Sequence, residues 1–205
     1  MTALELSYYI INNQKKFSNQ GLSPLKLQKL LYYIHVWGIV SHHEVLETYF
    51  EKWNFGPVNP EVYSHYKKFG NSNIIPETNT GKKLSVRSKK FVDFILSNYI
   101  KYDAVTLSAM THRDSPWQET LHNQTISKNS IRKFYSKLNF AKNFPLGKSK
   151  PFYPIETDLH YAYVLDFPQN ESQKPFYFNS YSEYLKLEKK NQKDFEAEIK
   201  NWSNS

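Results

Sequence analysis

Apolar residues recur at helical spacing in the segment that follows Ser23-Pro24. Their positions fit the i, i+3, i+4, i+7 pattern of an amphipathic helix. They are Leu27, Leu30, Leu31 and Ile34. Ser23 is a favourable N-cap, and proline is tolerated in the first turn because its missing N–H would have no helical partner there. The pattern predicts a helix that reaches Trp37, with its leucines in the core and its polar and aromatic residues on the flank.

Seven further segments carry helical spacing or a helix start signal. They are 2–17, 60–68, a segment after Ser85, 104–111, a segment that starts at Ser115-Pro116, a segment after Ser127, and 182–202. The expected N-caps include Asn59, Ser85, Asp103 and Ser127. In the first helix, Leu4, Tyr8 and Ile11 share the face that we expect to be buried. Ser115 and Gln118 have the spacing of a capping box.

Alternating side chains predict strands in two regions. Within residues 45–55, successive side chains alternate between two sets: Leu46, Thr48, Phe50 and Lys52 on one face, and Glu47, Tyr49, Glu51 and Trp53 on the other. Gly56-Pro57 follows, and we expect it to end this strand. Residues 159–167 and 175–178 read as a β-hairpin. Residues 142–154 are rich in proline and indicate either a linker or an ordered wrap. The expected fold is mainly α: a compact helical domain with a small β element over 1–144, and an extension over 145–205 with a β-hairpin and a charged helix.

The amino-acid composition excludes cysteine chemistry and argues against a membrane or secreted protein. The chain has 205 residues and no cysteine, which rules out disulfides, thiolate zinc sites and cysteine nucleophiles. It contains no apolar run long enough to cross a membrane, and its first residues lack the features of a secretory leader. We therefore expect a cytoplasmic protein with no membrane partner.

The basic charge is concentrated in the predicted helical domain. Residues 1–145 hold 19 basic and 10 acidic side chains, whereas 146–205 hold 8 basic and 9 acidic ones. A basic body attracts nucleic acid, so a nucleic-acid-binding regulator is one interpretation. The lysine, asparagine and aromatic bias of an AT-rich genome explains the same numbers, and no dense arginine stripe is present.

The chemistry-bearing residues do not assemble into a known catalytic motif. His112-Arg113-Asp114 resembles the catalytic loop of protein kinases, but the glycine-rich loop and D-F-G segment that the reaction needs are missing. We expect these three residues to be structural. His42-His43 lacks further ligands at metal-binding spacing, and His35 reads as a buried helix residue. The sequence therefore predicts a non-enzyme without metal or cofactor.

Three ordered motifs resemble the Panacea (SocA-like) antitoxin domain. They are S-P-L-K-L-Q-K-L-L-Y-Y at 23–33, W-N-F-G-P-V at 53–58 followed by P-E-V-Y at 60–63, and T-H at 111–112 with P-W at 116–117. The resemblance covers about Ala3 to Leu138. It implies an antitoxin that neutralises a cognate toxin by direct binding. One branch of the family instead delivers toxins to an AAA+ protease, so a proteolytic adaptor is an alternative.

The motif residues divide into two expected roles. Those expected to hold the scaffold are Ser23, Pro24, Leu27, Leu30, Leu31, Gly56, Pro57, Pro60 and Pro116. Those expected to form a shared partner-binding groove are Gln28, Tyr32, Tyr33, Trp53, His112 and Trp117. Tyrosine and tryptophan combine apolar area with a polar group, which suits either a core or an interface.

Overall fold

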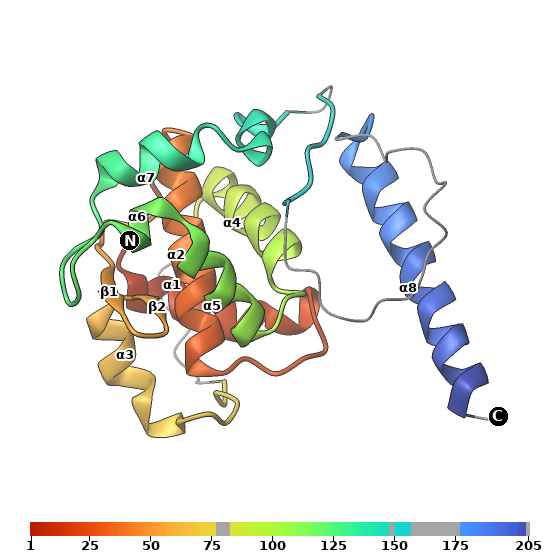
Figure 1. Cartoon of the computed structure of the whole chain (residues 1–205), viewed down its shortest axis with the longest axis horizontal. Helices are drawn as coiled ribbons and strands as arrows, with labels where there is room; N and C mark the ends of the chain where they lie inside the picture. The colour runs from red at the N-terminus through yellow and green to blue at the C-terminus, as the bar shows by residue number, and fades with distance from the viewer. Residues whose placement is uncertain (77–82, 148–149, 157–176, 204–205) are drawn as a thin grey trace.

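The computed structural model describes residues 1–76, 83–147, 150–156 and 177–203 (Figure 1). Its helices are α1 (Ala3–Asn13), α2 (Pro24–Val40), α3 (Pro60–Tyr66), α4 (Val86–Tyr99), α5 (Ala104–Arg113), α6 (Ser115–Gln118), α7 (Lys128–Tyr135) and α8 (Tyr181–Ser203). Short 3-10 helices span Gln14–Lys16, Lys67–Phe69 and Asn139–Asn143. The strands are β1 (Glu51–Trp53) and β2 (Gly56–Val58). The predicted mainly α fold with a small β element is confirmed.

Most predicted helix starts are confirmed by a side-chain cap. Ser23, Asn59, Ser85, Asp103 and Ser127 each accept a hydrogen bond from a backbone N–H in the first turn of the helix that follows. Each bond satisfies a donor that the helix itself leaves unpaired.

The predicted capping box at the start of α6 is wrong. Asp114, one residue earlier, precedes the helix, and Ser115 is its first residue. The Gln118 amide instead donates to the backbone oxygen of His112 at 3.0 Å. The side chain thus ties α6 back to the end of α5.

Helix α2 lies at the centre of the helical body and is buried on every side. All residues from Lys26 to Ile39 are buried. The helix contacts α1, α3, α4, α5, α7 and β2, and Figure 1 shows it enclosed by the surrounding helices. The predicted exposed flank is therefore wrong. A helix covered all round needs partners for its polar side chains, and those partners come from distant segments.

The predicted inner face of α1 is confirmed at Ile11 and wrong at Leu4 and Tyr8. The buried residues are Ala3, Leu6, Ser7, Ile10 and Ile11, whereas Leu4 and Tyr8 are only half-buried. Ser7 occupies the buried stripe because its hydroxyl donates to the Leu4 carbonyl at 2.6 Å and lies 3.1 Å from the Tyr66 hydroxyl. Because serine is polar, the pattern of apolar residues alone does not reveal the buried face of α1.

The predicted strand over 45–55 mostly has no regular secondary structure. Only Glu51–Trp53 pair with Gly56–Val58, in an antiparallel hairpin that joins Trp53 to Gly56. Gly56 and Pro57 thus belong to the second strand and do not merely end the first. The other edge of β1 is bonded by residues 123–126, which exchange backbone hydrogen bonds with Phe50 and Lys52.

Residues 139–147 and 150–156 wrap over the helical body. Phe140 and Phe152 are buried in the same core cluster as α2 and α4. Asn143 fixes the wrap because its side chain bonds the backbone of Tyr153 in both directions, at 2.8 and 3.0 Å. Of the two alternatives for this segment, the ordered wrap is the correct one.

Helix α8 follows the wrap and docks through its first turns. The Tyr181 hydroxyl donates to Ser97 at 2.7 Å, and Lys101 pairs with Glu188. The rest of the helix extends away from α4 (Figure 1). The predicted hairpin at 159–167 and 175–178 falls almost entirely on residues 157–176, outside the described residues.

Candidate functional site

The hairpin β1–β2 sits between α2 and the α5–α6 corner, and Gly56 allows the close fit. The glycine has a φ of +97°, in a region that L side chains rarely adopt. A Cβ at this position would lie 2.6 Å from Thr111 Oγ1 and 2.7 Å from Lys29 Nζ. Gly56 is therefore needed both for its backbone conformation and for the absence of a side chain.

Lys29 supports the hairpin from inside the protein. Its side chain is fully buried, and its ammonium donates to the Pro57 carbonyl at 2.9 Å. Burial lowers the pKa of Lys29 to about 7, because the charged form loses its hydration. The lysine thus holds β2 against α2, and it is not available to solvent or to a partner.

Gln28 has a comparable structural task one residue earlier. Its amide accepts from the Asn59 N–H at 2.8 Å and donates to the Asn59 carbonyl at 3.1 Å. Asn59 in turn caps α3 through its side-chain oxygen and donates its amide to Thr48 and to the Tyr49 carbonyl. Both the oxygen and the nitrogen of the Gln28 amide are bonded to Asn59, so the main task of this side chain is structural.

His112 and Trp117 brace the opposite side of the hairpin. His112 Nδ1 lies 2.7 Å from the Ser108 carbonyl and Nε2 lies 2.9 Å from the Asn54 carbonyl. The Trp117 ring packs edge-on against the imidazole, with centroids 4.1 Å apart. Lys52 lies 4.5 Å above the same indole and donates to the Gln118 carbonyl. The T-H and P-W motif therefore fixes the turn of the hairpin.

The clamped hairpin borders an open groove of about 940 Å³. Its walls come from the start of α2, from the hairpin, from α3 and from residues 122–123. The groove contains apolar side chains from all three elements together with Glu51 and Lys67, so its floor is largely apolar and carries both charges. We refer to it as the motif groove.

Exposed aromatic residues line the motif groove. Phe55 stands at the hairpin tip with 70% of its surface exposed, and Tyr63 on α3 is 41% exposed. The Trp53 ring contacts the Tyr63 ring edge-on at 4.8 Å, and its N–H donates to Glu51 at 2.9 Å. These three residues form an aromatic rim that a partner can reach.

The structure separates the six residues expected to share a groove. Gln28 and Trp53 line the motif groove, and His112 and Trp117 lie behind the hairpin that forms its wall. Tyr32 and Tyr33 are buried farther along α2, near Asp114 and Tyr135. Phe55 is not among the six residues expected to form the groove, although an aromatic residue in a tight turn between paired strands is a recognisable sign of an exposed tip.

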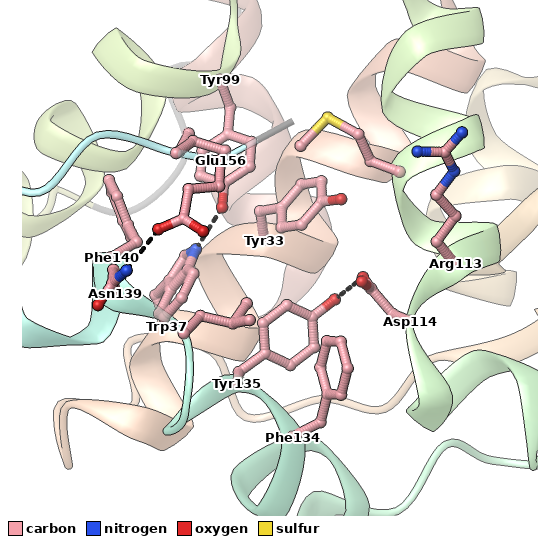
Figure 2. A pocket seen from close by; sticks show the side chains of 13 residues that line it. Tyr33, Trp37, Tyr99, Arg113, Asp114, Phe134, Tyr135, Asn139, Phe140 and Glu156 are labelled. Atoms are coloured by element: carbon pink, nitrogen blue, oxygen red, sulfur yellow. Dashed lines mark hydrogen bonds between the residues drawn. The ribbon is translucent and has the colours of Figure 1, made fainter. Parts of the chain in front are cut away.

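Tyr33 belongs to a second, smaller cavity of about 260 Å³ between α2, α5 and α7 (Figure 2). The Tyr135 hydroxyl donates to the carboxyl of Asp114, and burial raises the pKa of Asp114 to about 6. Asp114 is thus a partly buried acid that supports α7, and it lies in the bend between α5 and α6. We refer to this cavity as the aromatic pocket.

Within the described residues, no group of three or more His, Cys, Asp or Glu side chains is arranged to hold a metal ion. In the same part of the chain, no helix combines the length and the apolar character needed to cross a membrane.

One comparison identifies a related family. Residues 27–118 match the family model described as "Antitoxin SocA-like, Panacea domain". The matched region runs from the core of α2 to the end of α6, and it includes the hairpin and the aromatic rim. No curated protein and no solved structure matches the chain significantly.

Proposed function

We propose that this chain, built around a region of the SocA-like Panacea type, is a non-enzymatic antitoxin that binds a toxin protein in the cytoplasm and blocks it. The observation that carries the proposal is the aromatic rim of Trp53, Phe55 and Tyr63 on a rigidly held hairpin. Large aromatic side chains at the centre of an interface contribute most of the binding energy in many complexes.

The buried motif residues support this function indirectly. Lys29 and Gln28 fix the hairpin from below, and His112 fixes its turn through the Asn54 carbonyl. A surface that is ordered before binding loses little conformational entropy when a partner docks. On this proposal the motif residues keep the hairpin rigid, and the side chains of the rim make the contact.

Coexpression with the product of the adjacent gene tests the proposal. We expect the wild-type chain to restore growth if that product is toxic, and to copurify with it. The double substitution Phe55→Ser and Tyr63→Ser removes two exposed rings and is expected to abolish rescue while leaving the melting temperature nearly unchanged. A toxic neighbour that stays toxic beside the wild-type chain would refute the proposal.

Val86→Ser is a matched control. Val86 is 73% exposed at the start of α4 and does not line the motif groove. Its substitution is expected to leave rescue intact. If the rim and control variants rescue equally well, the toxin binds elsewhere.

The toxin's lifetime separates blocking from delivery to an AAA+ protease. Blocking predicts a stable complex and an unchanged toxin half-life, whereas an adaptor shortens that half-life. The nucleic-acid alternative predicts a salt-sensitive shift of the promoter DNA by the purified chain.

A further inference from the structure

The aromatic pocket contains a carboxylate without a cationic partner. Asp114 accepts a hydrogen bond from Tyr135, and no ion pair joins it to a lysine or arginine in the part of the chain that the structure describes. Arg113 lines the same pocket, but its side chain is exposed and remains hydrated. A partly buried negative charge is normally paired, so this carboxylate has unused capacity to bind a cation.

A second polar group in the pocket is also unused. Tyr33 is only 2% exposed, and its hydroxyl makes no hydrogen bond within the described residues. Figure 2 shows this hydroxyl directed toward the side of the pocket that holds Arg113 and Asp114. Because the hydroxyl opens onto the pocket, a bound donor can reach it and use its free acceptor capacity.

The walls of the pocket suit a positive charge. Tyr33 stacks on Tyr99 at 4.1 Å, and Trp37 donates to the Tyr99 hydroxyl at 2.8 Å. On the other side Glu156 supplies a second carboxylate, held at 2.6 Å by the Asn139 amide. Aromatic faces attract cations through their quadrupole, and a desolvated site strengthens that attraction.

We propose that the aromatic pocket binds a primary ammonium group, with Asp114 as its counter-ion and the Tyr33 hydroxyl as an additional hydrogen-bond acceptor. The volume of about 260 Å³ admits an alkylammonium group and little more. The group belongs either to a free small amine or to a lysine side chain of a bound protein. The pocket and the motif groove lie at different ends of α2, so this site does not depend on the proposed function.

Titration of the full chain with n-butylammonium, putrescine and butyrate, followed by calorimetry and NMR, tests the proposal. We expect saturable binding of both amines and none of butyrate. Tighter binding of putrescine identifies a free diamine as the ligand. Tighter binding of n-butylammonium, which mimics a lysine side chain, identifies a protein ligand. Saturation by butyrate alone would assign the pocket to Arg113 and overturn the proposal.

Three substitutions make the test specific. Asp114→Asn is expected to weaken amine binding about tenfold or more, because it removes the carboxylate that serves as the counter-ion of the bound ammonium. Tyr33→Phe removes an unused hydroxyl and keeps the ring, so it is expected to fold and to weaken binding about threefold. Asp93→Asn is the control, since Asp93 also accepts from a tyrosine, Tyr9, but has Lys89 as its counter-ion. Wild-type affinity in both pocket variants, or no amine binding at all, would refute the site.

Discussion

At the scale of single residues, buried polar side chains organise this protein. Lys29, Gln28 and Asn59 are residue types that usually lie on surfaces. Here each is buried and donates a hydrogen bond to a backbone carbonyl of another segment. Each polar group thus bonds to the protein in place of water. These bonds satisfy the polar groups of Gln28 and Lys29, two of the polar side chains that the enclosed helix α2 buries.

Gly56 is the residue at which the hairpin is most sensitive to change. Gly56→Ala adds a methyl group against Thr111 and Lys29 and forces an unfavourable φ, so we expect a loss of about 2–4 kcal/mol in the free energy of unfolding. Urea denaturation measures it. Gly147→Ala is the control, since its added methyl meets nothing within 4 Å. Equal stability of the two variants would contradict the close packing of Gly56 against Thr111 and Lys29.

His35 is expected to make stability depend on pH. Burial lowers its pKa to about 4 from an ordinary value of 6.5, so the unfolded chain binds the proton first as pH falls. The stability that neutral His35 contributes is complete above pH 6.5 and is lost as pH falls toward 4. Asp114, with its pKa raised to about 6, contributes the opposite slope over part of this range. The two effects must therefore be separated by comparing a variant with the wild type.

His35→Gln isolates the histidine. The stability difference between wild type and variant is expected to change by about 3 kcal/mol between pH 7 and pH 4, in the direction that favours the variant at low pH. Urea titrations at several pH values measure that difference, and NMR of the imidazole gives its midpoint. Parallel pH curves for the two proteins would show that His35 does not titrate as a buried group.

At the scale of elements, α2 is the support on which the other helices and the hairpin pack. It contributes leucines to the core, Lys29 and Gln28 to the hairpin, and Tyr33 and Trp37 to the aromatic pocket. A disturbance in this helix is therefore expected to reach both candidate sites.

Leu27→Asp tests the position of α2. The side chain is fully buried, and an aspartate there would carry an unpaired charge into the core. We expect the variant to lack a cooperative melting transition by circular dichroism. Leu121→Asp, at a leucine that is 77% exposed, is expected to melt like the wild type. A native-like melting curve for Leu27→Asp would show that α2 is not the core.

At the scale of the whole molecule, the wrap joins the C-terminal segment to the helical body. Phe152 packs against Phe94 and Phe140 of the body and against Tyr181 and Tyr184 of α8. The boundary after residue 144 stays a prediction. The shared aromatic cluster favours one cooperative unit for the wrap and the body.

Phe152→Ala distinguishes one unit from two. Removing this buried ring is expected to lower the free energy of unfolding of the whole protein by about 3–5 kcal/mol. Circular dichroism and tryptophan fluorescence should then report the same shifted transition. Leu187→Ala, at an exposed position of α8, is the control. If Phe152→Ala removes only an early unfolding transition and leaves the main transition unchanged, the C-terminal segment is a separate domain.

The sequence alone determined most of the helix starts, the mainly α class and the three motifs, because N-caps, proline positions and apolar spacing act over a few residues. Tertiary structure decided which faces are buried, which strand residues pair, and where the motifs meet. Ser7 in the buried stripe of α1 and Lys29 beneath Gly56 depend on partners about 59 and 28 residues away. Contacts over such distances leave no local pattern. The Ser23–Trp37 segment could therefore be recognised as a helix, but its central place could not.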